Sequence, residues 1–145
     1  MQTQTVASRP TAYWLVAILA LVWNLIGVAM FYMQVTMDDT RLAGLTELQR
    51  QVYQATPAWV NVAFAFAVFG GLLGAIGLLV RRRWAVTMFG ISLLALLVQF
   101  LGAYLVTPAW AAYGAAGLAM PLLLLVIAAF LWSYARRALA RGWLR

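Results

Sequence analysis

Four long stretches of the sequence are almost entirely apolar and contain no charged residue. They cover residues 13–37, 57–80, 84–106 and 115–134. A helix needs about 20 residues, at about 1.5 Å each, to cross the hydrocarbon core of a bilayer. Because backbone polar groups find no water there, such runs must be helical. The sequence therefore predicts an all-α integral membrane protein, a bundle of four transmembrane helices in a single membrane domain.

The composition of the chain fits a lipid environment. Hydrophobic residues make up 66% of the 145 residues and charged residues 9%, against about 45–50% and about 25% in soluble domains. The net charge is +7, there is no Lys, and most Arg residues lie in short clusters beside apolar runs. Clusters in these places suit anionic lipid headgroups, so we expect the bilayer as a partner and no nucleic acid.

The Arg residues are divided unequally between the two sides of this four-helix topology. One side holds Arg9, Arg81, Arg82, Arg83, Arg136, Arg137, Arg141 and Arg145. The other side holds Arg41 and Arg50, together with all three acidic residues, in the loop 38–56. The positive-inside rule therefore predicts that both termini, including the basic tail 135–145, are cytoplasmic.

The outer loop 38–56 has the signature of a short helix. Thr46 and Gln49 have the spacing of a capping box, and Pro57 suits the first position of the next helix. We expect this short helix to lie at the membrane interface. It would be either an ordinary surface helix, which we favour, or a lid over a pocket.

Side-chain amides interrupt three of the apolar runs. Asn24 lies near the middle of the first run, whereas Gln34, Asn61 and Gln99 fall in the outer half of the predicted bundle. An amide that faces hydrocarbon without a partner costs several kcal/mol, so these groups should face the bundle interior. They would either bond to one another between helices, contributing about 1 kcal/mol or less each, or line a cavity.

The cavity interpretation gives a candidate ligand site. It would open to the outer side, with amides and aromatic rings as its walls. Uncharged donors and acceptors beside aromatic faces suit a small neutral or amphipathic molecule. The candidate ligand-binding residues are Asn24, Phe31, Gln34, Asn61, Gln99 and Tyr104.

Small residues form a stripe along one side of the second run. Gly70 and Gly74 form a GxxxG motif, and Gly77 extends it. Such motifs allow close contact between helix backbones, because lipid supplies no hydrophobic drive for helices to associate. The stripe would serve either packing inside the bundle or the seam of a homo-oligomer.

The sequence argues against an enzyme and against metal or cofactor chemistry. It contains no His, Cys or Lys, and its three carboxylates all lie in one loop. General acid–base catalysis and metal binding both require convergent groups of these kinds. The apolar runs also lack the ionisable residue that proton-coupled transport normally uses.

Several segments resemble a known family. The segments "WNLIGVAMFYMQVTM", "TPAWVN", "RRRWAV" and "ARGWLR" are similar to those of small four-helix bacterial inner-membrane proteins often described as sugar-transporter-like. The resemblance implies a location in the bacterial inner membrane and four helices. It has no defined binding motif, so it transfers no functional residue.

These observations lead to two hypotheses of function. In the first, the protein binds a small neutral or amphipathic molecule, or facilitates its passage. In the second, it is a non-transporting accessory or scaffold subunit of a larger membrane complex or homo-oligomer.

Overall fold

The computed structural model describes residues 11–144, and every regular element within them is helical. The long helices are α1 (Thr11–Val35), α4 (Ala58–Leu79), α5 (Trp84–Val106) and α7 (Ala119–Ala140). The short elements between them are α2 (Asp39–Ala43), α3 (Glu47–Ala55), α6 (Ala109–Tyr113) and the 3₁₀ helix η1 (Ala115–Leu118). The prediction of an all-helical chain with four long helices is confirmed for the described residues.

The surface of the long helices suits hydrocarbon. All four are long and apolar enough to cross a membrane, with mean hydropathies of 2.1 to 2.3. Their outward side chains are apolar as well: Leu94, Leu105 and Val126 are 65%, 80% and 64% exposed. A continuous apolar surface of this kind aggregates in water and is stable among acyl chains.

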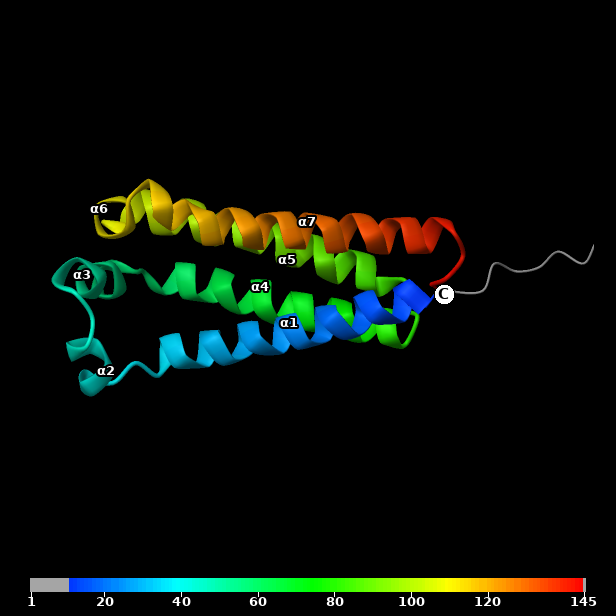
Figure 1. The fold of residues 1–145 in the computed structure, drawn as a ribbon, viewed down its shortest axis with the longest axis horizontal. Helices are drawn as coiled ribbons and strands as arrows, with labels where there is room; N and C mark the ends of the chain where they lie inside the picture. The colour runs from blue at the N-terminus through cyan, green and yellow to red at the C-terminus, as the bar shows by residue number, and fades with distance from the viewer. Residues whose placement is uncertain (1–10, 145) are drawn as a thin grey trace, which may run out of the picture.

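The long helices pack in the order in which they occur in the sequence. Contacts join α1 to α4, α4 to α5, and α5 to α7 (Figure 1). The most enclosed of the four is α4: half of its most apolar 18-residue segment is buried. The corresponding segments of α1, α5 and the η1–α7 run are 17%, 22% and 6% buried. By contrast, α1 and α7 diverge from the end where α1 begins toward the end that carries α2, α3 and α6 (Figure 1). We call these the arginine end and the α3 end.

Glycines allow α4 and α5 to approach each other closely. A Cβ atom added at Gly74 would lie 2.7 Å from the ring of Phe89, and one at Gly77 would lie 2.8 Å from the Cβ of Ala85. A Cβ at Gly70 would lie 3.2 Å from a backbone carbonyl oxygen of α5. The glycine stripe is therefore buried against α5, as the internal-packing alternative expects, and does not lie on the outer surface of the chain.

The turn between α4 and α5 contains a residue in the left-handed region. The N–H of Arg82 donates to the carbonyl of Gly77 (2.8 Å) and the N–H of Arg81 to that of Leu78 (3.2 Å). These two bonds form the Schellman motif that ends α4. Arg81 has φ 59°, a conformation that this motif usually assigns to glycine.

The same motif ends α7 and folds the following residues back. The N–H of Trp143 donates to the carbonyl of Ala138 (2.9 Å), and Gly142 takes the left-handed position with φ 74°. Trp143 and Leu144 are buried in the core of the arginine end. The Trp143 ring stands edge-on to Tyr13 of α1, with 5.8 Å between centroids. These contacts join α1 and α7 at the arginine end.

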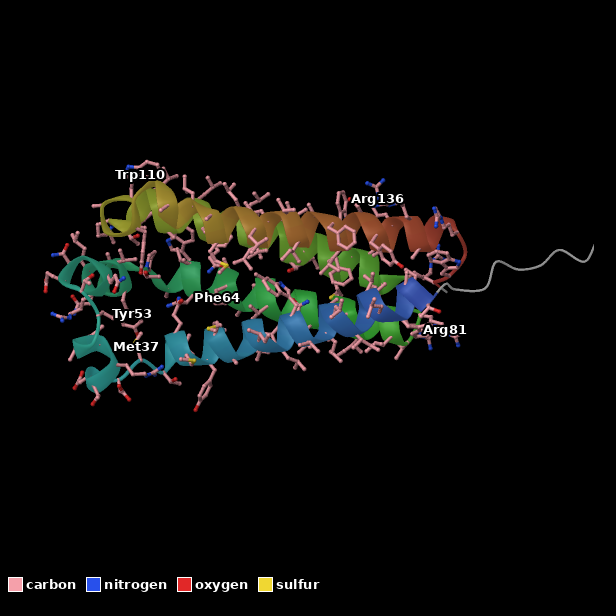
Figure 2. The ribbon with its side chains drawn as sticks, viewed as in Figure 1. Met37, Tyr53, Phe64, Arg81, Trp110 and Arg136 are labelled. Carbon is pink, nitrogen blue, oxygen red and sulfur yellow. The ribbon has the colours of Figure 1, made fainter. Side chains whose placement is uncertain are left out.

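The fourth helix runs further than the apolar stretch suggests. The sequence places the fourth span at 115–134, whereas α7 ends at Ala140. Arg136 lies on this extension with its guanidinium over the Trp132 ring, 4.8 Å from the centroid, and a cation in the last turns suits the helix dipole. Figure 2 labels Arg81 and Arg136 at this end. The described arginines here are Arg81, Arg82, Arg83, Arg136, Arg137 and Arg141. Arg9 and Arg145 lie outside the described residues.

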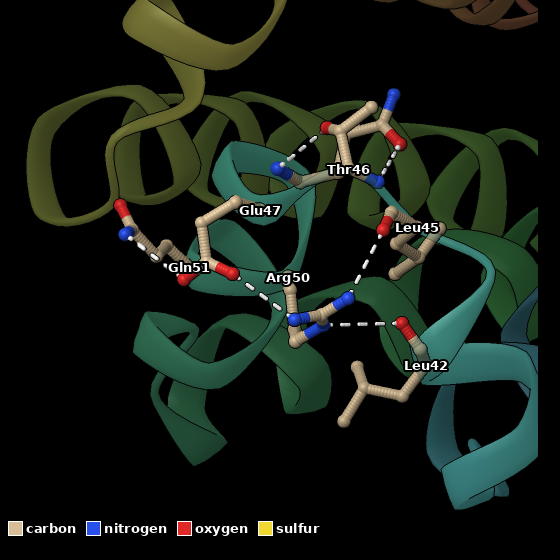
Figure 3. Close-up of polar contacts among 7 residues, drawn as sticks. Leu42, Leu45, Thr46, Glu47, Arg50 and Gln51 are labelled. Carbon is tan, nitrogen blue, oxygen red and sulfur yellow. Dashed lines mark hydrogen bonds and ion pairs between the residues drawn. The ribbon is translucent and has the colours of Figure 1, made fainter.

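The predicted capping box is present at the start of α3. The hydroxyl of Thr46 accepts from the N–H of Gln49, and the Gln49 side chain accepts from the N–H of Thr46, both at 3.2 Å (Figure 3). Pro57 immediately precedes α4. The prediction of a short helix in this loop is therefore confirmed.

The two arginines of the α3 end bind backbone carbonyls. Arg41 donates to the carbonyl of Met33 near the end of α1 (2.9 Å). Arg50 donates to the carbonyls of Leu42 (3.3 Å) and Leu45 (3.2 Å), which connect α2 to α3 (Figure 3). Arg41 reaches the last turn of α1, where carbonyls lack helical partners, and Arg50 adds a second donor to the Leu42 carbonyl, which also accepts from the N–H of Leu45 (3.1 Å). Both cations therefore have a structural role in the loop.

Candidate functional site

A cavity of about 350 Å³ lies within the bundle and is lined by all four long helices. Phe64 of α4 (Figure 2), Phe89 of α5 and Leu131 of α7 are among its apolar walls. Met30 of α1 and Met120 of α7 also line it. The cavity therefore occupies the space in which α1 and α7 diverge, and none of its described lining residues is charged. Its volume is within the range of small-molecule sites, about 300–1,000 Å³.

Gln99 of α5 contributes a buried polar atom to this cavity. Its side chain lines the cavity. Its carbonyl oxygen Oε1 is buried and has no hydrogen-bond partner within residues 11–144. Leaving a buried acceptor unpaired costs about 1–3 kcal/mol, so this atom marks a position where a donor from a bound molecule would be stabilising.

The donor groups of two other polar side chains of the cavity, Asn24 and Ser92, already have partners. Asn24 Nδ2 donates to the carbonyl of Ala20 on its own helix (2.8 Å), and its Oδ1 packs so closely on α4 that a Cβ at Gly71 would lie 2.0 Å away. Ser92 Oγ donates to the carbonyl of Ala67 (2.6 Å) and joins α5 to α4. Gln99 is therefore the cavity residue best placed to bind a polar group.

The remaining predicted amides form a pair elsewhere. Gln34 Nε2 donates to Asn61 Oδ1 across 2.6 Å and joins α1 to α4 near the α3 end. Neither residue lines the cavity that contains Gln99. This pair fits the interhelical explanation of the amides, whereas Asn24 and Gln99 fit the cavity explanation.

The two predicted aromatic residues also lie outside the cavity. Phe31 contacts Phe64 and Phe69 edge-on, at centroid distances of 5.4 and 5.9 Å. The hydroxyl of Tyr104 donates to the carbonyl of Gly117 (3.0 Å). Pro121 follows Gly117 by four residues and has no N–H to offer this carbonyl, so the tyrosine satisfies it. The structure thus does not bring the six predicted residues together as one site.

A second cavity, of about 410 Å³, lies at the α3 end. Its walls include Gln34, Arg41 and Gln49, so it is more polar than the first. Met37 and Tyr53 also line it (Figure 2). Met30 lines both cavities, and its flexible side chain therefore stands between them.

Comparisons with protein-family models, with curated proteins and with solved structures find no match for this chain.

Met30 and Ser92 belong to the cavity but were not predicted as site residues. A methionine or a serine in an apolar helix gives no signal by itself, because either is common in ordinary packing. Ser92 shares a helical face with Gln99, at a spacing of seven residues. This spacing is the one sequence pattern that could have indicated Ser92 as a cavity residue. Within residues 11–144, no group of three or more acidic side chains could hold a metal ion.

The geometry of the cavity that contains Gln99, which we call the main cavity, is suited to binding. Its walls can bury an apolar body, and Gln99 Oε1 can accept one hydrogen bond. At the arginine end it is bounded by the packed core that includes Tyr13, Phe89 and Trp143. A bound molecule would therefore exchange through the space between α1 and α7 or through the α3 end.

Proposed function

We propose that this chain is an integral membrane protein that binds a small, uncharged, amphipathic molecule, or facilitates its passage, through the cavity between α1 and α7. The observation that carries the proposal is Gln99 Oε1, buried and without a hydrogen-bond partner among residues 11–144, in a cavity lined by all four long helices. An apolar enclosure with one free acceptor is stabilised by a ligand that brings a donor and an apolar body.

The proposed orientation places the arginine end in the cytoplasm. Six described arginines gather there, against two at the other end, and the positive-inside rule favours the cytoplasm for the end richer in arginine. In this orientation α3 lies at the outer membrane surface and the cavity opens toward the outer half. The sequence resemblance supports the bacterial inner membrane as the location.

The alternative function is that of an accessory or scaffold subunit. The Gln34–Asn61 bond favours it, because these amides are used for packing and not for a ligand. The buried glycine stripe does not favour it, because a partner would have to bind another face. Such a face exists on α4, where Phe66 is 58% exposed.

The test uses a matched pair of neighbouring alanines in α7. Ala128 is buried and lines the cavity, whereas Ala129 does not line it. Native mass spectrometry of the purified protein should detect a bound small molecule in the wild type and in Ala129→Leu. Ala128→Leu, which fills part of the cavity, should lose it. An absent adduct in the wild type, or equal adducts in both variants, would contradict ligand binding at this place.

A further inference from the structure

The main cavity is bordered by apolar side chains on the side where α1 and α7 separate. Of its lining residues, Ile26 is 49% exposed, Met30 55% and Met120 59%. These side chains lie on the surface that meets acyl chains when the four helices span a bilayer. The border of the cavity is therefore open to lipid and carries no group that would attract a hydrated molecule.

The polarity of the cavity limits the number of hydroxyl groups that it can satisfy. Asn24, Ser92 and Gln99 are its polar amide and hydroxyl side chains; Ser92 Oγ and Asn24 Nδ2 already donate to backbone carbonyls, and Gln99 Oε1 is buried without a partner among residues 11–144. A sugar would bring many hydroxyl groups and leave most of them unpaired, each at a cost of desolvation. A molecule with one or two hydroxyl groups and an apolar chain fits this lining better.

The length and direction of the cavity also suit a chain. Its lining on α7 extends from Met120 to Leu131, which is about 16 Å at 1.5 Å per residue. Gln99 lies seven residues before the end of α5 at Val106, about 10 Å from the α3 end. A bound chain whose hydroxyl group meets Gln99 would point its tail toward the bilayer centre. Lipids of the leaflet on the α3 side have the same direction.

We infer that the ligand of this cavity is a neutral single-chain lipid with a hydroxyl headgroup, which enters sideways from the bilayer between α1 and α7. The inference rests on the proposed function and names its ligand class and its route. The hydroxyl group donates to Gln99 Oε1, and the chain lies along Phe89 and Leu131. Met30 and Met120 border the lateral entrance.

The first experiment compares two photoreactive probes in reconstituted vesicles. One is a monoacylglycerol with a diazirine in its chain, and the other is the methyl ester of the same acid, which has no donor. The monoacylglycerol should label residues of the cavity, and Gln99→Leu should reduce this labelling about three- to tenfold, the equivalent of one hydrogen bond. The ester should label the wild type more weakly and should be insensitive to Gln99→Leu.

The matched control is Gln54→Leu, which removes an exposed amide of α3 that lines neither cavity, and it should label like the wild type. Gln99→Met provides a second variant of similar length, so that a general loss of structure in Gln99→Leu is recognised. Equal labelling by the two probes, or labelling unchanged in both Gln99 variants, would overturn the role of Gln99.

The second experiment tests the lateral route and uses the absence of Cys from the chain. Met30→Cys and Met120→Cys, joined by a short bismaleimide, should lose labelling by monoacylglycerol, while each single variant treated with the same reagent retains it. Undiminished labelling of the joined protein would overturn lateral entry. If native mass spectrometry finds a bound water-soluble compound and the monoacylglycerol does not label, this inference fails while the proposed function stands; if nothing binds, both fail.

Discussion

Gln34 Nε2 of α1 donates a hydrogen bond to Asn61 Oδ1 of α4, with 2.6 Å between the two atoms. The bond lies near the α3 end, away from the region where α1 and α7 meet. It gives the α3 end of α1, which is far from α7, a polar attachment to its neighbour. Two amides that bond to each other also resolve the cost of placing both in an apolar environment.

Removing this bond should loosen α1. We expect Gln34→Leu and Asn61→Leu each to lower the free energy of unfolding by about 1 kcal/mol, because each leaves the other amide without its partner. The double variant should lose less than the sum, with a coupling energy of about 0.6 kcal/mol. Unfolding in mixed micelles measures all three, and strictly additive losses would show that the bond contributes nothing.

The glycine stripe should tolerate no larger side chain. Gly74→Ala places a Cβ 2.7 Å from the ring of Phe89, which is itself enclosed, and we expect a loss of about 1–3 kcal/mol from overpacking. Gly44→Ala is the control, because its Cβ would meet only a carbonyl oxygen at 3.4 Å. The measurement is thermal unfolding of both variants together with their oligomeric state. A stable Gly74→Ala monomer derived from a wild-type oligomer would instead place this stripe at a subunit seam.

Replacing Arg81, whose backbone lies in the left-handed region, by glycine should raise the stability of the protein. Arg81→Gly removes a side chain from φ 59°, and we expect about 0.5–1 kcal/mol of stabilisation after the greater entropy of glycine in the unfolded chain is subtracted. Arg82 and Arg83 keep positive charge in this turn, so the proposed orientation in the membrane should not change. Gly142→Ala, at φ 74°, should be destabilised by a similar amount. Thermal unfolding of both variants measures this, and a lower stability of Arg81→Gly would refute the strain.

The loop that contains α2 and α3 should depend on Arg50. Its guanidinium reaches the carbonyls of Leu42 and Leu45 and the Glu47 carboxylate, at 3.3, 3.2 and 3.0 Å (Figure 3). Arg50→Met should increase amide hydrogen exchange across residues 39–55. Arg50→Lys should restore little of the lost protection, because an ammonium group cannot reach several acceptors at once as the planar guanidinium does. Arg82→Met, at the other end, is the control. Unchanged exchange in Arg50→Met would show that the loop holds itself without this side chain.

Tyr104 should act through the backbone of the fourth helix. Its hydroxyl donates to the Gly117 carbonyl, which Pro121 leaves without a helical partner. Tyr104→Phe should therefore cost about 1 kcal/mol in unfolding free energy, while binding in the cavity is unchanged. If Tyr104→Phe instead lost most ligand binding and kept its unfolding free energy, Tyr104 would have to belong to the ligand site.

The four helices and the capping box could be predicted because their signals are local. Hydropathy over about 20 residues fixes a long helix, and Thr46 with Gln49 fixes the start of α3 by spacing alone. The hydrogen bond of each amide could not be predicted, because it depends on the angle and depth at which two helices cross. Asn24 therefore bonds to its own helix, whereas Gln34 finds Asn61, although both lie on one stripe of α1.

The divergence of α1 and α7 and the inward fold of Trp143 were likewise beyond the sequence. A basic tail predicts a solvated segment, and only the geometry after Gly142 returns Trp143 to the core. The cavity follows from the same arrangement, since it exists where two helices fail to pack. No pattern of residues within either helix indicates that gap.

The sequential order of helix packing has a consequence for biosynthesis. Each of α4, α5 and α7 leaves the ribosome when the helix against which it packs has already been made. Each long helix after α1 can therefore pack against the long helix made just before it. The seam between α1 and α7 forms only once α7 has been made, so the opening along it exists as soon as α7 packs against α5.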